Sequence, residues 1–373
     1  MPSSQRTSTN RIPAVRGPAE ARDDRPGRSA EFVARGRALV PGLTVSLLVA
    51  VAATALGHLV PIVGGPVFGI VLGIVLAAAI KPGDDLRPGL SFAAKPVLQS
   101  SIVVLGATLS LQQIATVGAS SLPVMLGTVV AALLGAWILG RLLGVRGDAQ
   151  ILIGVGTGIC GASAIAATTA VLKPHESQVA YAIGTIFTFN IIAVLAFPGL
   201  GHALGMDPHA FGLWAGTAIN DTSSVVAAAF SYGGDAGPYA VVVKLTRTLT
   251  LIPIVVALAV WKARRDTVAT ARIGSGAGFR WRSLPWRKLV PVFLVGFVAA
   301  SVLDTLGVIP VSWHPGLSAA GTFLITIALA GIGSSLRLSD MRRAGARPLL
   351  LGAVLWILVA VTSLGLQAAT GSV

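Results

Sequence analysis

Eleven apolar stretches of roughly membrane length follow one another along this chain, with short connections between them. A transmembrane helix needs roughly 20 predominantly apolar residues, so this pattern predicts an all-α polytopic membrane protein. The stretches are 39–60, 62–80, 94–111, 121–140, 150–172, 178–199, 209–231, 236–260, 288–306, 315–335 and 348–369.

The composition agrees with this class and argues against a nucleic-acid partner. Of the 373 residues, 54% are hydrophobic and 11% are charged, whereas soluble domains carry roughly 25% charged residues. The net charge of +14 is spread over the N-terminal tail, short loops and the segment 262–288 rather than gathered on one face. We therefore expect the lipid bilayer as a partner, and no nucleic acid. The single cysteine, Cys160, excludes an internal disulfide and fits a cytoplasmic-membrane protein.

The distribution of Lys and Arg predicts an orientation in a bacterial inner membrane. Residues 1–38 are rich in Arg, Ser, Pro and Asp and read as a disordered basic cytoplasmic tail; residues 39–373 form the transmembrane domain. The connection 261–287 carries seven Lys and Arg residues, which makes it cytoplasmic by the positive-inside rule. The connections near 61, 112–120 and 304–314 carry none and are predicted to face outward. The sequence leaves a homo-oligomer open.

Two pairs of segments look like internal repeats. "GATLSLQQI" (106–114) resembles "GSSLRLSDM" (333–341), and "GTGICGASAIAA" (156–167) aligns with "GTAINDTSSVVA" (216–227). The first member of the second pair also spells the dinucleotide motif G-x-G-x-x-G, but its flanks are apolar and of membrane length, and no acidic residue stands about 20 positions later in a strand–helix unit. The glycines therefore predict a helix broken within the membrane.

The repeats also constrain the topology. If both broken segments crossed fully, they would run in the same direction, whereas the other repeat pair would run in opposite directions. Re-entrant hairpins that enter from opposite sides remove this conflict. We therefore predict inverted repeats with about nine full transmembrane helices and two re-entrant or discontinuous helices that meet near the midplane, a common plan for transporters.

Three charged residues fall inside apolar segments: Asp221, Lys244 and Arg247. Each costs about 2.5–3.5 kcal/mol at a helix centre, so they should pair with one another or face a wet cavity. Lys244 and Arg247 are three residues apart and share one helix face. Two interpretations stay open: a structural ion pair with Asp221, or a substrate and coupling-ion site.

The polar residues around the two breaks complete the candidate site. Amide groups at half-helix N-termini suit an anion, whereas carbonyl and hydroxyl oxygens suit Na⁺. The pattern predicts a secondary transporter in which Lys244, Arg247 and amides near Gly158 and Asn220 hold a small anion and Asp221 binds H⁺ or Na⁺. No other cofactor, metal site or catalytic residue is expected; an anion channel and a membrane enzyme are the rival classes. The additional candidates are Thr157, Cys160, Ser163, Asn190, Thr222, Ser223 and Ser224.

Three stretches resemble a known family. "CGASAIAATTAVLKPHESQVAYAIGTIF", "FGLWAGTAINDTSSVVAAA" and "KLTRTL" are similar to the YeiH-type bacterial inner-membrane proteins, commonly labelled sulfate exporters. That resemblance implies sulfate or an organic sulfonate as the substrate, and Asp221, Lys244 and Arg247 match the family pattern. Family members often carry His at position 220 and Gln at position 224, where this chain has Asn and Ser, which leaves the coupling ion open. More distantly, "GATLSL" resembles bile-acid symporter-type transporters, which implies broken helices that cross the membrane fully.

Overall fold

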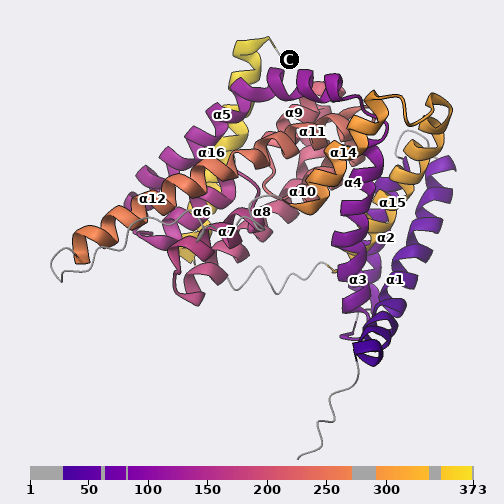
Figure 1. Cartoon of the computed structure of the whole chain (residues 1–373), viewed down its shortest axis with the longest axis horizontal. Helices are drawn as coiled ribbons and strands as arrows, with labels where there is room; N and C mark the ends of the chain where they lie inside the picture. The colour runs from indigo at the N-terminus through magenta and orange to yellow at the C-terminus, as the bar shows by residue number, and fades with distance from the viewer. Residues whose placement is uncertain (1–27, 60–63, 81–82, 271–290, 336–345, 372–373) are drawn as a thin grey trace, which may run out of the picture.

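The computed structural model describes residues 28–59, 64–80, 83–270, 291–335 and 346–371 (Figure 1). Within those ranges every regular element is helical, which confirms the predicted all-α class. The helices form two bundles that stand side by side (Figure 1). The small bundle consists of α1 (Arg28–Leu59), α2 (Gly64–Ile80), α3 (Arg87–Phe92), the π-helical turn Ala93–Val97, α4 (Leu98–Gly106), α14 (Val292–Thr305) and α15 (His314–Ser335). The large bundle consists of α5 (Leu111–Leu142), α6 (Asp148–Gly158), α7 (Ala162–Leu172), α8 (Glu176–Ala203), α9 (Pro208–Ala218), α10 (Thr222–Tyr232), α11 (Ala236–Leu249), α12 (Leu251–Thr270) and α16 (Ala346–Thr370).

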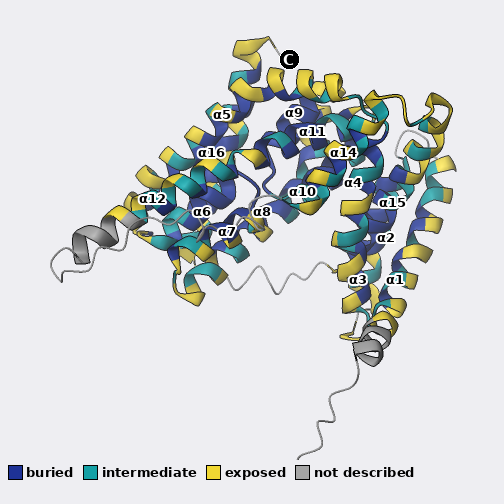
Figure 2. Ribbon diagram, in the orientation of Figure 1, coloured by how far each residue is buried: buried dark blue, intermediate teal, exposed yellow. Residues whose placement is uncertain are grey.

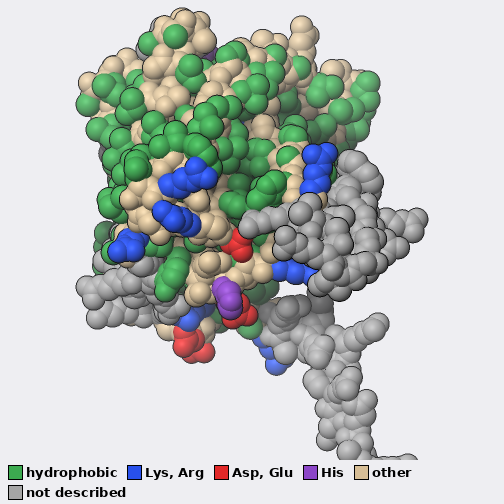
Figure 3. Space-filling model, turned by 90° about the vertical axis from the view of Figure 1, so that its left-hand side faces the viewer, with side chains coloured by type: hydrophobic (Ala, Val, Ile, Leu, Met, Phe, Trp, Pro, Cys, Tyr) green, Lys and Arg blue, Asp and Glu red, His purple; other side chains and the backbone are tan. Residues whose placement is uncertain are grey.

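Seven helical stretches in the described part of the chain are long and apolar enough to cross a membrane. The helices α2 and α14 are shorter, with 17 and 14 residues, and occupy the two remaining predicted crossings. Apolar side chains are spread over the upper part of the face seen in Figure 3, as expected for a surface in contact with lipid. A polytopic membrane protein is thereby confirmed. The seven stretches are Gly36–Leu59, Arg87–Gly106, Leu111–Leu142, Glu176–Ala203, Ala236–Lys262, Val311–Ser335 and Ala346–Thr370.

Three predicted boundaries differ from the structure. The helix α5 begins at Leu111 because Ser110 and Gln113 form a capping box, in which each side chain accepts a hydrogen bond from the other residue's backbone N–H. Residues 112–120, predicted as an outward-facing connection, are therefore the first turns of α5. The helix α1 begins at Arg28, so residues 28–38 of the predicted tail are helical. The helix α12 runs to Thr270, so residues 261–270 of the predicted basic connection are helical as well. Residues 1–27 of the tail and 271–287 of the connection lie outside the described residues.

The helices α6 and α7 form a re-entrant hairpin. A Cβ atom added to Gly156 in α6 would lie 3.1 Å from the side chain of Ile165 in α7. One continuous helix would separate these two positions by about 13 Å along its axis, so the chain turns back at residues 159–161. Consistent with this, Ala149 at the start of α6 shares an apolar cluster with Ala182 near the start of α8, the helix that follows α7.

The helices α9 and α10 form a second hairpin. At the end of α10, the Tyr232 hydroxyl donates a hydrogen bond to the carbonyl oxygen of Met206, which precedes α9. The Tyr232 ring also stacks on Phe211 of α9, with ring centroids 3.8 Å apart. The two ends of the hairpin therefore lie together. This geometry confirms the re-entrant prediction and corrects the expectation, taken from the bile-acid symporter-type resemblance, that the broken helices cross fully.

The two hairpins start from opposite ends of the α11–α12 span. Near the end of that span, the Lys262 ammonium donates to the carbonyl oxygen of Leu172, the last residue of α7. At its beginning, the carbonyl oxygen of Ala236 would lie 2.9 Å from a Cβ atom added to Gly212 in α9. The hairpins therefore approach each other from opposite sides, as predicted.

The two hairpins also match each other in length. Each consists of two helices of 11 residues, and each helix bound of the second hairpin lies 60 positions after that of the first (148 to 208, 158 to 218, 162 to 222, 172 to 232). This regularity fits the predicted duplication. Residues 336–341 of the other proposed repeat lie outside the described residues, and the inverted repeat stays a prediction.

Charged side chains are distributed unevenly between the two ends of the bundles. Apart from Lys244 and Arg247, the described Lys and Arg residues lie at or toward the end where α1 begins and α12 ends, which we call the basic end. Three aspartates, Asp207, Asp235 and Asp304, lie at the opposite end. Figure 3 shows the charged side chains of one face toward its lower part, below the apolar band. The basic-end residues are Arg37, Arg87, Lys95, Arg141, Arg146, Lys173, Lys262, Arg264 and Arg347.

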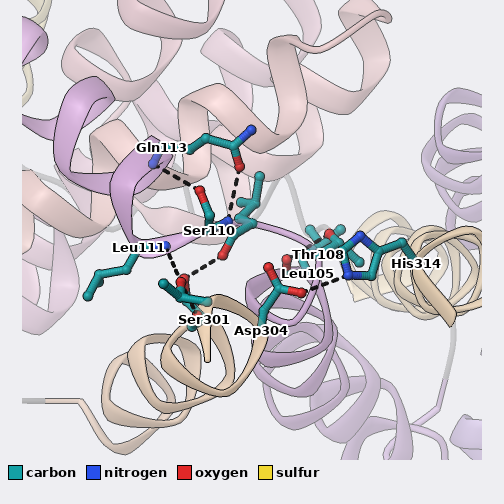
Figure 4. A network of polar contacts seen from close by, with 10 residues as sticks. Leu105, Thr108, Ser110, Leu111, Gln113, Ser301, Asp304 and His314 are labelled. Atoms are coloured by element: carbon teal, nitrogen blue, oxygen red, sulfur yellow. Dashed lines mark hydrogen bonds and ion pairs between the residues drawn. The ribbon is translucent and has the colours of Figure 1, made fainter. Parts of the chain in front are cut away.

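A polar network at the end opposite the basic end fixes the turn between the two bundles (Figure 4). The N–H of Leu111, the first residue of α5, donates to the Thr305 hydroxyl of α14 over 2.8 Å. The Ser301 hydroxyl, one turn earlier, donates to the carbonyl oxygen of Leu109. Nearby, the Asp304 carboxylate contacts the His314 ring at 2.7 Å. The first turn of α5 is therefore held by side chains of the small bundle.

Candidate functional site

The tips of the two hairpins meet in the most buried part of the large bundle, which Figure 2 shows around α8, α10 and α11. The breaks are residues 159–161 and 219–221. A Cβ atom added to Gly161 would lie 3.5 Å from the backbone of Asn220 and Asp221. Gly161 also has a φ of +64°, in the left-handed region that side chains other than glycine rarely adopt. Glycine is therefore needed where one break approaches the other.

Lys244 of α11 binds both breaks at once. Its ammonium donates to the carbonyl oxygen of Ile159 over 2.9 Å and to that of Ile219 over 2.7 Å, and the side chain is fully buried. Ile159 caps the C-terminus of α6 and Ile219 caps that of α9. A helix C-terminus carries unpaired carbonyl groups and a partial negative charge of about half an elementary charge. Lys244 therefore neutralises the negative ends of two half-helices.

Arg247 does the same one turn further along α11. Its Nε donates to the carbonyl oxygen of Gly158 over 2.9 Å, and one terminal nitrogen donates to the carbonyl oxygen of Thr217. The other terminal nitrogen, Nη2, is buried without a hydrogen-bond partner among the described residues. Gly158 therefore contributes an acceptor at the end of α6.

Asp221 binds its own helix rather than the two cations. It is the N-cap residue of α10, and one carboxylate oxygen accepts hydrogen bonds from the backbone N–H (3.0 Å) and the hydroxyl of Ser223. Within the described residues it forms no ion pair with Lys244 or Arg247. The structural ion pair that the sequence left open is therefore absent, because the cations bind helix-end carbonyls instead.

Two asparagines lie beside the second break with unused hydrogen-bonding groups. The Asn190 side-chain oxygen, from α8, accepts from the backbone N–H groups of Asn220 (3.2 Å) and Asp221 (3.3 Å). The Asn190 amide nitrogen, both side-chain polar atoms of Asn220 and the Thr157 hydroxyl are buried without a partner among the described residues. Buried polar groups are normally hydrogen-bonded, so these atoms can bind a polar ligand.

The positive ends of the half-helices are the accessible ones. The N-terminal residues of α10 are half-buried (Asp221, Thr222, Ser223 and Ser224), and Ser163 in the first turn of α7 is exposed. The N-terminus of α7 has no side-chain cap. Further along α10, Val226 packs in a cluster with residues of α2, α4 and α15, so this helix lies along the boundary between the two bundles.

The structure brings Lys244, Arg247 and Asp221 to the two breaks, but sequence reasoning missed several neighbouring groups. The carbonyl oxygens of Ile159, Ile219 and Thr217 are backbone atoms, and the residue type does not reveal that they belong to a site. It also missed α16, where the Ser363 hydroxyl lies 2.7 Å from that of Thr217 and the Gln367 amide donates to Ser363. Two polar residues four apart in an apolar helix were the available signal. Cys160 is 3% exposed and packs with apolar residues of α12.

Comparison with known proteins agrees with the family resemblance. A family model described as "Conserved hypothetical protein 698" matches residues 41–352. A UPF0324 membrane protein of Fusobacterium nucleatum is 39% identical over 353 residues, covering 88% of this chain and 98% of the relative. The chain belongs to this family of membrane proteins. Further members are UPF0324 membrane proteins of Streptococcus pyogenes serotype M3 (38% identical, covering 89% of this chain and 97% of the relative) and Streptococcus mutans (38% identical, 87% and 96%). The YeiH-type resemblance is thereby confirmed.

Proposed function

We propose that this chain is a secondary active transporter of a small anion, such as sulfate or an organic sulfonate, driven by a gradient of H⁺ or Na⁺. Family membership and the apolar helices support a polytopic membrane protein. The anion and the coupling rest on the electrostatics of the hairpin tips. Two opposed hairpins whose tips meet inside a bundle also fit the broken-helix sites of known transporter folds.

The observation that carries the proposal is an electrostatic asymmetry. The C-terminal, negative ends of α6 and α9 are buried and bound by Lys244 and Arg247. The N-terminal, positive ends of α7 and α10 remain accessible. If each helix end carries about half a charge, the four ends cancel one another, and the two cations together with ionised Asp221 leave an excess of about one positive charge. An anion at the N-termini of α7 and α10 balances that excess.

Asp221 is the group through which the ion gradient acts. It caps α10 beside the proposed anion site and is half-buried, so its charge changes the local electrostatics directly. Protonation of Asp221 increases the positive excess to about two charges and favours a divalent anion such as sulfate. Movement of the large bundle relative to the small one along α10 would expose the site to each side in turn.

The proposed orientation places the basic end in the bacterial cytoplasm. The described Lys and Arg residues outside the crossing gather there, and cytoplasmic loops carry an excess of these residues. In this orientation the α6–α7 hairpin enters from the cytoplasm and the α9–α10 hairpin enters from outside.

The test is uptake of radiolabelled sulfate and of a small sulfonate by proteoliposomes that contain the purified chain, with and without an imposed ion gradient. Asp221→Asn should abolish the effect of the gradient and keep measurable anion binding. The matched control is Asp207→Asn, because Asp207 also caps a hairpin helix, α9, but at the surface. This control should keep the gradient effect.

The same preparation separates a transporter from a channel. A transporter gives saturable uptake that responds to the gradient, whereas a channel gives electrical conductance with no ion coupling. Failure of every small anion to stabilise the protein or to enter the vesicles would refute the proposal.

A further inference from the structure

The carbonyl oxygens that a coupling Na⁺ would bind are already occupied in this chain. In transporters with broken helices, unwound carbonyls and half-helix C-termini coordinate the cation. Here the corresponding atoms are the carbonyl oxygens of Ile159 and Ile219, one from each hairpin, and the Lys244 ammonium lies 2.9 and 2.7 Å from them. The oxygen ligands converge on a side chain instead of a free ion.

We propose that Lys244 is a built-in cation that takes the place of Na⁺ where the two hairpin tips meet, so that transport does not depend on Na⁺. The statement about transport rests on the proposed function; the statement about the cation does not.

The other helix-end carbonyls at the two breaks also accept from a cationic side chain. The neighbouring helix-end carbonyls, those of Gly158 and Thr217, accept from Arg247. Lys244 is fully buried, and a Na⁺ beside it would face a like charge at short range in a medium of low polarity. Within the described residues, no group of three or more His, Cys, Asp or Glu residues could hold a metal ion elsewhere.

Lys262 provides a matched control for Lys244. Its ammonium also donates to a helix-terminal carbonyl oxygen, that of Leu172. It binds only one helix end, however, and it lies at the basic end, where it is half-buried. Removing Lys262 therefore removes a comparable hydrogen bond without emptying a pair of converging carbonyls.

The experiment measures the thermal unfolding midpoint of the purified full chain in NaCl, KCl and choline chloride at equal ionic strength. The midpoint of wild type should not change between the three salts, and neither should the midpoint of Lys262→Ala. Lys244→Ala should unfold several degrees lower in choline chloride, and Na⁺ or methylammonium should restore much of that loss with a saturable dose dependence. Sulfate uptake by wild-type proteoliposomes should be unchanged when choline replaces Na⁺.

Three results would overturn the inference: a Na⁺-specific rise of the wild-type midpoint, a Lys244→Ala protein that responds to neither cation, or wild-type uptake that requires Na⁺. If Lys244→Ala folds only when Na⁺ or methylammonium is present during purification, the inference is supported. If Lys244→Ala folds under no condition, the test uses the longer apolar variant Lys244→Met together with the wild-type salt series. A Lys244→Met protein that is as stable as wild type in choline chloride contradicts the inference. Absence of uptake for any anion refutes the proposed function and leaves the midpoint results valid.

Discussion

Gly161 is the position where a single added methyl group should strain the first break. Its φ is +64° and its ψ is −126°, a combination that costs other residues roughly 1–3 kcal/mol of strain. An added Cβ atom would also lie 3.2 Å from the Ile186 side chain, which must move by a few tenths of an ångström, and in ordinary van der Waals contact, at 3.5 Å, with the backbone of Asn220. Reduced freedom of the unfolded chain returns only about 0.4–1 kcal/mol.

We therefore expect Gly161→Ala to lower the free energy of unfolding by about 1–3 kcal/mol, or the unfolding midpoint by roughly 2–8 °C. The control is Gly205→Ala, because Gly205 also has a φ of +64° but no atom lies within 4 Å of an added Cβ atom. Midpoints of both variants are measured in one detergent and salt, with and without sulfate. The rise of the unfolding midpoint on addition of sulfate should be smaller in Gly161→Ala than in wild type, and unchanged in Gly205→Ala. Equal midpoints and equal sulfate responses for the two variants would show that the close packing around Gly161 does not matter.

Two further predictions concern the fold. Single cysteines are placed at both ends of each hairpin in a Cys160→Ser background and treated with a membrane-impermeant thiol reagent. The two ends of one hairpin should react from one side of the membrane, and the two ends of the other hairpin from the opposite side. Labelling of the two ends of one hairpin from opposite sides contradicts the re-entrant fold. Gly73→Leu should destabilise the small bundle, because an added Cβ atom would lie 2.6 Å from the carbonyl oxygen of Ala330, whereas Gly199→Leu, with open space around it, should unfold like wild type. The cysteine positions are Arg146 and His175 for the first hairpin and Leu204 and Asp235 for the second.

The helix plan of this chain could be predicted because its physical causes are local. Apolar length identified the crossings, and the glycine-rich repeats together with the Lys and Arg distribution identified two hairpins from opposite sides. The start of α5 was missed although its signal is equally local: Ser110 and Gln113 have the spacing of a capping box. Hydropathy alone placed that boundary ten residues too late, because the first turns of α5 mix polar and apolar residues.

The partners of the buried cations were harder to predict. Sequence reasoning linked Lys244 and Arg247 to the breaks and expected an anion and Asp221 beside them, but it did not predict their hydrogen-bond partners within the protein. Their partners are backbone carbonyl oxygens, which every residue has and which become available only where a helix ends. A break placed by glycines implies two such ends, so unpaired carbonyls should be counted as acceptors before charged side chains are paired with one another.

In the proposed function, the same charged residues are both structural and functional. Each hairpin tip brings a negative helix end and a positive helix end to nearly the same depth of the bundle. Because Lys244 and Arg247 lie on one helix that contacts both tips, they cancel only the negative ends and hold the tips together at the same time. The positive ends of α7 and α10 are then left for a ligand. Substituting either cation should therefore reduce stability and anion affinity together, whereas a change at Asp221 should affect the ion coupling and spare the fold.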